Sequence, residues 1–403
     1  MNGTIKFFDK SNNNDLLYNK WIAKFIAFIL CFDIISLGLN SLFNKYIAYG
    51  TVVDSLLLYA IAFYYIVRGA IASNKRIQSE SVLFLIGLSI VILSNLLIHP
   101  NIEQYIKPTD YIYLATSAVV LIVSSLDYSI PYIYSLLSKI YKIAIIFGVI
   151  HLIYGAKSGI YTTWMSDMAS GYSLLPAELF AIDYWFRFKK GWVWGAIGAI
   201  TIFLFGSRGP LLLVFLFLLI SLVRFSKSIR AKMLLISGLL AISGFVYSKA
   251  YIGLLISLQR FFSRYDITIA SIEKVLYYED VSNGRTGIYN EVIALINKHP
   301  LFGSGFFSDR SIGVYAHNLI LEILVDFGYV IGIPIIVFIF YKISHALLCA
   351  KNIKDEGLFS FLLILILSSV GKLMISGSYL TDPIFFLLLS VIIQIKSEGK
   401  LQQ

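Results

Sequence analysis

The chain has 403 residues, of which 58% are hydrophobic and 14% charged, and its mean hydropathy is +0.80. A soluble protein of this size could not hide so much apolar surface from water, so the composition excludes a soluble enzyme. The formal net charge is +10. Its Lys and Arg residues fall in short clusters between apolar runs, which is how membrane topology is encoded, so this charge does not indicate a nucleic-acid partner.

Apolar runs of membrane-spanning length recur along the chain. A helix needs about 20 residues to cross a hydrocarbon core of roughly 30 Å. Continuous runs such as Pro210 to Val223 lack the alternation of a β-barrel strand. We therefore predict an all-α polytopic membrane protein with about 12 transmembrane helices. In chain order the predicted spans cover residues 21–43, 47–68, 81–98, 110–126, 138–155, 167–187, 191–206, 210–224, 231–250, 316–347, 357–376 and 380–396.

The distribution of Lys and Arg in the short connections predicts the orientation. If the N-terminus is cytoplasmic, most of these cations also face the cytoplasm, as the positive-inside rule requires. An even number of spans then places both termini inside and leaves residues 251–315 as one large external loop. No internal repeat or linker is visible, so residues 1–403 are predicted to form a single membrane domain. The two cysteines, Cys31 and Cys349, lie outside this loop, so no structural disulfide is expected, and two thiols cannot make a zinc site.

The external loop begins with two arginines at helical spacing. In LQRFFSRYD, Arg260 and Arg264 stand at i and i+4, so a helix would put both guanidinium groups on one face. The aromatic residues Phe261, Phe262 and Tyr265 flank them. The pattern fits an interfacial helix with arginines on lipid headgroups, and it fits equally a clamp for a phosphate-bearing ligand.

A short amphipathic helix is predicted further along the loop. Ile288, Val292, Leu295 and Ile296 recur at helical spacing, and Arg285 stands just before them. An arginine at a helix N-terminus is a natural anion site. A solvated arginine on a loop is the alternative that the residues alone favour.

A tight external turn is predicted at FGSRGP, residues 205–210. Gly206 and Gly209 allow close approach of the backbone, and Pro210 can open the next helix. Arg208 is then held at the outer membrane surface. It is either a snorkelling arginine or, since a lone cation there runs against the charge bias, a functional one.

His317 and Asn318 stand at the mouth of the next apolar run. A histidine with its usual pKa near neutrality can accept a proton, although a lone histidine at a helix start is more often structural. Glu322 and Asp326 lie about 140° and 180° round the helix from His317, so they do not orient it. They share a face of their own, which we expect to point into the bundle or a water-filled cavity. Other charges inside apolar runs have no partner that the sequence reveals: Asp33, Asp54, Glu178, Asp183, Lys372 and Asp382.

In two stretches the chain resembles the bacterial O-antigen polymerase (Wzy-type) and O-antigen ligase superfamily. The C-terminal signature of that superfamily resembles GRTGIYNEVIALINKHPLFGSGFF followed by AHNLILEILVDFGYVIGI. There an Arg precedes an amphipathic helix, P-L-F-G-x-G follows, and H-N opens a helix. SRGP resembles the earlier external arginine motif. The likeness is close over residues 201–210 and 280–335, and elsewhere it covers only the span count and the placement of the loop.

The resemblance implies a C-type glycosyltransferase architecture that acts at the outer, periplasmic face of the bacterial cytoplasmic membrane. Donor and acceptor would be undecaprenyl-diphosphate-linked oligosaccharides, with neither a metal nor another cofactor. Arg208 and Arg285 would match the arginines that bind the diphosphate, and His317 the base that activates the acceptor hydroxyl, supported by Asn318. Arg260 and Arg264 match no firm motif, and a diphosphate-binding role for them stays open. Membrane lipid and a protein that regulates chain length are the further candidate partners.

Three activities stay in view. A polymerase would join repeat units, and the modest loop and the Ile- and Tyr-rich chain favour this reading. A ligase would transfer finished glycan to the lipid A core with the same donor chemistry. A flippase for lipid-linked oligosaccharides would also need many spans and buried charges, but the absence of an internal repeat and the single large loop favour an enzyme.

Overall fold

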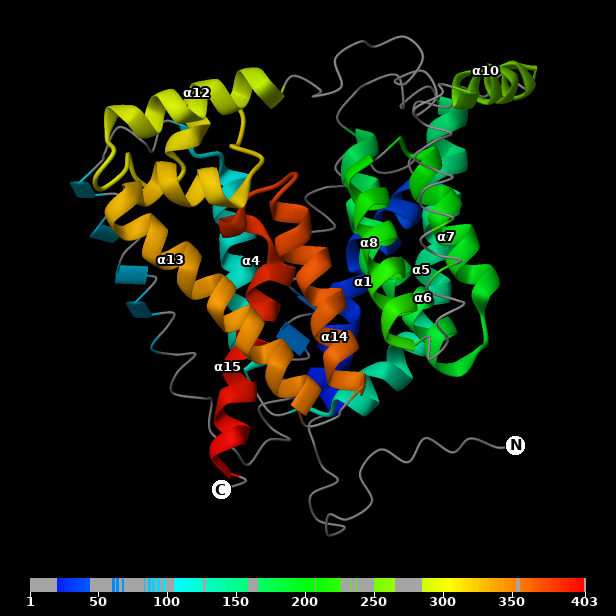
Figure 1. Ribbon diagram of the computed structural model, residues 1–403, viewed down its shortest axis with the longest axis horizontal. Coiled ribbons are helices and arrows are strands. Elements are labelled where there is room, and N and C mark those ends of the chain that lie inside the picture. The colour runs from blue at the N-terminus through cyan, green and yellow to red at the C-terminus, as the bar shows by residue number, and fades with distance from the viewer. Residues whose placement is uncertain are drawn as a thin grey trace.

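The computed structural model describes residues 20–43, 105–125, 128–158, 166–206, 208–225, 250–264, 285–352 and 356–401, with isolated positions between 60 and 98 and at 233 and 237. All regular structure in these stretches is helical (Figure 1). The predicted spans 47–68, 81–98 and 231–250, and Asp54, lie largely or wholly outside the described residues. The α-helices are α1 (Lys20–Phe43), α4 (Pro108–Ser124), α5 (Ile130–Ser158), α6 (Ser166–Phe188), α7 (Trp192–Leu204), α8 (Arg208–Phe225), α10 (Ala250–Ser263), α12 (Arg285–Lys298), α13 (Leu319–Asn352), α14 (Glu356–Ile366) and α15 (Pro383–Leu401).

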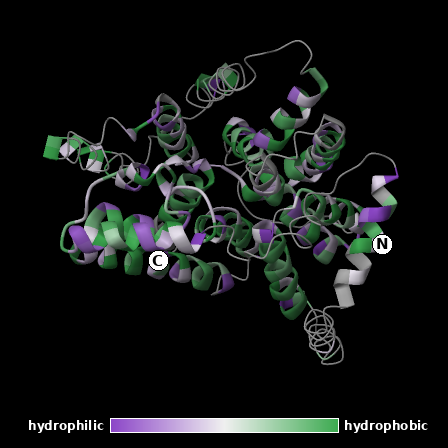
Figure 2. Ribbon diagram, turned by 90° about the horizontal axis from the view of Figure 1, so that it is seen from above, coloured by the Kyte–Doolittle hydropathy of each residue, from purple (hydrophilic) through white to green (hydrophobic). Residues whose placement is uncertain are grey.

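Four of these helices are long and apolar enough to cross a membrane, namely α1, α5, α8 and α13. Helices α4, α7 and α15 are shorter and apolar, and so is α14 with the π-helical turn η5 (Leu367–Gly371) that continues it. Seen from above, hydrophobic residues dominate most helices, and short hydrophilic stretches interrupt them along the same ribbons (Figure 2). The prediction of an all-helical protein with several membrane spans is confirmed, whereas the total of about 12 spans stays a prediction.

The core forms where helices cross closely. Helix α1 packs along α5 and against α6, α4 packs on α15, and α6 also contacts α7 and α8. At the crossing of α1 and α5, a Cβ on Gly38 would lie 2.6 Å from the Cβ of Phe147, so only glycine fits there. Without a hydrophobic force between helices in lipid, such close packing is what holds a bundle together.

One end of the bundle carries the irregular structure. Helix α12 runs along the top of the view in Figure 1, above the first part of α13. The short 3₁₀ helix η4 (Ser308–Ile312) connects these elements. A turn at Phe205 and Gly206 follows α7, and α8 begins with Arg208 at one end and has Arg224 near the other. The predicted turn is confirmed, with Gly206 in the left-handed region at φ 76°.

The predicted uninterrupted span 316–347 differs from the structure. Helix α13 begins at Leu319 and contains a sharp break at Gly328, where φ is 66° and ψ is −170°. These angles are accessible to glycine and strained for other residues. The break divides α13 into a short arm, residues 319–327, and a long arm, residues 329–352.

Candidate functional site

The break in α13 is closed by the turn at residues 300–305. Four backbone hydrogen bonds join the two segments: Ser304 N to Val325 O at 2.8 Å, Gly305 N to Asp326 O at 3.2 Å, Tyr329 N to Pro300 O at 2.7 Å and Val330 N to Leu301 O at 3.1 Å. A Cβ on Gly303 would overlap the backbone of Asp326, and one on Gly328 would overlap the backbone of Leu301. The glycines of the P-L-F-G-x-G stretch therefore serve a close backbone approach that builds the platform of the site.

The predicted amphipathic helix forms as α12 and closes the outer side of this platform. Val292 and Ile296 are buried, with Ile288 and Leu295 packed beside them. They contact Ala316, which is itself fully buried and immediately precedes His317. Helix α12 thus positions the residues around His317 from above and presents its own first residue, Arg285, at its N-terminus.

The next element is a buried ion pair that the sequence analysis did not single out. Asp309 and Arg310 lie on η4, and Nη1 of Arg310 donates to Oδ2 of Asp309 at 2.9 Å. Both side chains are buried, Asp309 completely. Burial raises the pKa of Asp309 above its ordinary value, and the charge of Arg310 opposes that rise. The guanidinium of Arg310 also lies 4.6 Å from the ring centre of Tyr315.

His317 sits directly beyond this pair in an uncommon backbone conformation. Its φ is 52°, in the left-handed region that non-glycine residues rarely adopt. The ring of Tyr315 meets its imidazole edge-on, with centroids 4.9 Å apart. On the other side Oγ of Ser376 lies 3.5 Å from Nδ1, at the limit of a hydrogen bond. Sequence spacing gave no sign of Tyr315 or Ser376 as neighbours, because their contacts depend on this turn.

The pKa of His317 is lowered from its usual value to about 4, chiefly by burial and in addition by the positive charges of Arg285 and Arg310. The imidazole is therefore neutral at neutral pH and has a lone pair to accept a proton. Its basicity is weaker than the value near neutrality that we expected from the sequence. An anion bound beside Arg285 would offset part of the positive field and raise the proton affinity of His317.

Asn318 caps the helix that follows. Its Oδ1 accepts hydrogen bonds from the backbone N–H groups of Ile320 at 3.0 Å and Leu321 at 3.2 Å. Its Nδ2 donates to the carbonyl of Met374 at 3.4 Å. Asparagine is a favoured N-cap, so Asn318 both starts α13 and ties it to the segment after η5.

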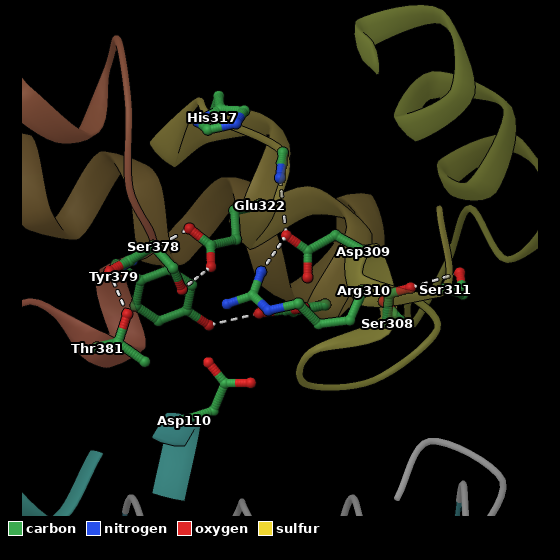
Figure 3. Close-up of polar contacts among 12 residues, drawn as sticks. Asp110, Ser308, Asp309, Arg310, Ser311, His317, Glu322, Ser378, Tyr379 and Thr381 are labelled. Atoms are coloured by element: carbon green, nitrogen blue, oxygen red, sulfur yellow. Dashed lines mark hydrogen bonds and ion pairs between the residues drawn. The ribbon is translucent and has the colours of Figure 1, made fainter. Parts of the chain in front are cut away.

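The two acids of the short arm face inward, as predicted. Glu322 and Asp326 are each 1% exposed. Glu322 accepts hydrogen bonds from the hydroxyl of Ser378 and from the backbone N–H of Tyr379, while Asp326 accepts one from the hydroxyl of Tyr379 at 2.7 Å. Figure 3 shows His317 on one side of Glu322 and the Asp309–Arg310 pair on the other. These acids fasten the segment before α15 to the short arm and do not contact His317 in any hydrogen bond that the structure describes.

The structure brings Arg285 toward His317 and connects it to the turn of Arg208. Arg285 is half-buried and lies within electrostatic range of His317. The hydroxyl of Tyr172 on α6 is within range of Arg285 as well. A Cβ on Gly209 would overlap this hydroxyl, so Tyr172 touches the start of α8 beside the exposed Arg208. Arg208, Arg285 and His317 thus occupy the same end of the bundle.

Arg260 and Arg264 are placed differently. Helix α10 ends at Ser263, so Arg264 lies just beyond it, and both arginines are exposed. Figure 1 draws α10 at the opposite side of the upper end from α12. The structure therefore does not assemble these two arginines with His317.

Two of the charges that the sequence left without partners, Lys372 and Asp382, pair with each other. Nζ of Lys372 lies 2.7 Å from Oδ2 of Asp382, and Asp382 also accepts a hydrogen bond from the backbone N–H of Phe385 at the start of α15. Asp33 on α1 is within electrostatic range of both members of this pair. Glu178 is fully buried, and its oxygens have no hydrogen-bond partner among the described residues. No group of three His, Cys, Asp or Glu side chains in the described stretches is arranged to hold a metal ion.

Comparison with known proteins bears on this end of the bundle. Residues 194–337 match the protein-family model described as O-antigen ligase. This stretch includes Arg208, Arg285, His317 and the break at Gly328, so the resemblance to the O-antigen polymerase and ligase superfamily is confirmed there. No curated protein and no solved structure matches the chain.

Proposed function

We propose that this protein is a membrane glycosyltransferase that joins undecaprenyl-diphosphate-linked oligosaccharide units, a surface-polysaccharide polymerase. The observation that carries the proposal is a neutral, half-buried imidazole at the start of α13 with the guanidinium of Arg285 in electrostatic range, inside the stretch that matches the family. A base beside a fixed cation is what transfer from a diphosphate leaving group requires.

The reaction divides between these two groups. The acceptor hydroxyl attacks the anomeric carbon of the donor sugar, the bond from that carbon to the diphosphate oxygen breaks, and the hydroxyl proton passes to the imidazole of His317. Negative charge grows on the departing diphosphate, where Arg285, and Arg208 at the neighbouring turn, stabilise it more in the transition state than in the ground state. Displacement in line would invert the anomeric centre.

The membrane setting follows from the substrate. The polyprenyl chain of the donor is apolar and would lie against the lipid-facing helices, while its diphosphate would reach the polar end at α12. In this proposal that end faces the periplasm of a bacterial cytoplasmic membrane, and both termini are cytoplasmic. In support, the basic residues Arg187 and Arg224 close α6 and α8 at the end opposite Arg208, as the positive-inside rule expects of a cytoplasmic side.

A second candidate is the ligase activity, because the matching family model carries the description O-antigen ligase. The two activities use the same donor chemistry and differ in the acceptor. The surface glycan of cells that lack the protein distinguishes them on a gel. Loss of the ladder with one repeat still on its anchor identifies a polymerase. Polymer that accumulates on the lipid carrier with none on the anchor identifies a ligase. An unchanged profile contradicts both and returns the flippase to consideration.

The role of His317 is tested by His317→Ala, measured as transfer from a lipid-linked donor by purified protein. A general base contributes about 10²- to 10⁴-fold, so we expect a loss in this range with unchanged expression. His345→Ala is the matched control, because this histidine lies on the long arm of α13 and is exposed. Unchanged glycan yield in the His317 variant would contradict the proposed base.

A further inference from the structure

The conformation of His317 has an energetic cost that the surroundings must offset. A left-handed backbone is energetically unfavourable for a non-glycine residue, and such residues persist only where neighbouring contacts hold them. The contacts that stabilise this conformation are made by the two residues on either side of His317. Asn318 fixes the C-terminal side through the helix cap, and Ala316 fixes the N-terminal side.

The contact on the N-terminal side is made by Asp309. Its Oδ2 accepts a hydrogen bond from the backbone N–H of Ala316 at 2.8 Å and, at the same oxygen, the one from Nη1 of Arg310 at 2.9 Å. A carboxylate with two donors on one oxygen has little freedom to turn. Asp309 and Ala316 are fully buried, so water does not replace the hydrogen bond between them.

Asp309 is itself held in place from both ends of η4. Phe307 and Gly313, which flank this short helix, both have left-handed backbones, with φ of 61° and 84°. The main chain therefore reverses on each side of Asp309 and returns to bring Ala316 onto its carboxylate. The side chain of Asp309 thus binds a backbone N–H group seven residues further along the chain.

We propose that Asp309 is a positioning residue, which sets the orientation of the His317 imidazole by holding the Ala316 amide through one carboxylate oxygen. The proposal rests on the proposed function, in which His317 is the base. Misplacement of a reacting group by about 1 Å can cost 10²-fold in rate. Loss of the Asp309 contact should therefore act on the turnover step while leaving the cation that binds the donor in place.

The experiment compares Asp309→Ala and Asp309→Asn in the full-length purified protein. Asparagine retains an oxygen that can accept the Ala316 hydrogen bond, whereas alanine removes it. We expect kcat of D309A to fall by about 10²-fold, with KM for the lipid-linked donor within about twofold, and D309N to recover most of kcat. The matched control is Asp183→Ala. It removes a buried carboxylate from an ion pair with Arg187, near the end of α6 that lies away from His317. It should lower thermal stability while kcat of the folded protein stays within about twofold.

A double variant tests whether Asp309 acts through His317. If it does, D309A/H317A is no slower than H317A alone, because there is no base left to misplace. A further loss equal to that of the single D309A variant would overturn the proposal. So would a kcat of D309A equal to that of the wild type, or an equal loss of kcat in D183A.

A labelling measurement keeps this inference separate from the proposed function. Diethyl pyrocarbonate acylates neutral imidazoles, and mass spectrometry reports the modification at His317 apart from the other histidines. Release of the turn should raise the labelling rate of His317 severalfold in D309A but not in D183A. Wild-type protein that transfers no glycan would overturn the proposed function, and the labelling would still decide whether Asp309 holds His317. Equal labelling in D309A and the wild type would overturn the positioning.

Discussion

Two buried carboxylate–guanidinium pairs lie at opposite ends of this molecule, and their surroundings differ. At the end away from His317, Asp183 on α6 pairs with Arg187 one turn later at 3.0 Å and accepts a hydrogen bond from Tyr134 on α5 at 3.1 Å. Arg224 on α8 donates to Ser360 on α14 at 3.3 Å. Every member of this cluster belongs to a regular helix.

The pair at the other end is built into irregular backbone. Asp309 and Arg310 lie on a short 3₁₀ helix between two left-handed residues, and the acids Glu322 and Asp326 are buried close by. Nε and Nη2 of Arg310 have no hydrogen-bond partner within the described part of the chain. The same kind of charge pair therefore lies within one regular helix at one end, whereas at the other end it holds a loop in a backbone conformation that non-glycine residues disfavour.

The largest expected effect is a difference in transfer rate between variants at the two ends of the molecule. Arg285→Ala removes the cation whose charge acts most strongly on His317, and we expect transfer to fall by about 10²- to 10³-fold, since the proposed charge partner of the leaving group is lost. Arg285→Lys should recover part of the rate. Rates of transfer from a lipid-linked donor measure this. Arg224→Ala is the control from the other end, and it should change thermal stability more than rate. Equal transfer rates in Arg285→Ala and Arg224→Ala would contradict the assignment of the reaction to the end that carries His317.

The next effect tests the backbone of the site end. Gly328→Ala introduces a Cβ against the backbone of Leu301 and a left-handed alanine. The free energy of unfolding should therefore fall by roughly 2 kcal/mol or more. The midpoint of thermal unfolding in detergent reports the change. Gly253→Ala on α10 is the matched control, because a Cβ there meets nothing within 4 Å. Alanine in that helix should be neutral or stabilising by up to about 1 kcal/mol, and an equal loss at both sites would contradict the role of Gly328.

A smaller effect concerns pH. Only the neutral imidazole can accept a proton, and its pKa in the free protein is about 4 because of burial and of Arg285 and Arg310. As the pH falls, kcat/KM should therefore stay level through the ordinary histidine range near 6.5 and decline only as the pH approaches 4. A profile of kcat/KM against pH at constant ionic strength measures this. A decline centred near 6.5 would show that the site does not perturb His317.

The smallest effect is expected at α10. Arg260→Ala and Arg264→Ala should each change transfer by less than about threefold, because an exposed cation away from the reacting groups acts through screened solvent. The same transfer assay measures it. A loss as large as that of Arg285→Ala would instead place these arginines at the donor, as the sequence allowed.

The parts of the site that the sequence predicted are those with local patterns. The spacing of Ile288, Val292 and Ile296 predicted α12, and the glycines beside Arg208 predicted the turn before α8, since periodicity and turn residues act within a few positions. The inward face of Glu322 and Asp326 followed from the cost of burying charge in an apolar run.

The remainder depended on contacts between distant segments. Gly328 stands within an unbroken apolar pattern, and the backbone that breaks the helix there comes from residues 300–305. The Asp309–Arg310 pair looks like an ordinary charged turn until the chain folds back to present the Ala316 amide. Arg260 and Arg264 fit the spacing of a phosphate clamp, but spacing along one helix does not say which neighbour that helix will meet.

The bend at Gly328 allows a tilt of the long arm of α13 to move the end of the short arm. Its short arm of nine residues, 319–327, is about 13 Å long at 1.5 Å per residue. Four backbone hydrogen bonds to residues 300–305 hold the chain on both sides of Gly328. If the long arm tilts by about 5° to match a thicker or thinner bilayer, the tip of a rigid short arm moves by about 1 Å. That tip adjoins His317, so we expect the thickness of the surrounding bilayer to affect the alignment of the imidazole that we propose as the base. Detergents and nanodiscs of different thickness are therefore different working conditions for the same chain.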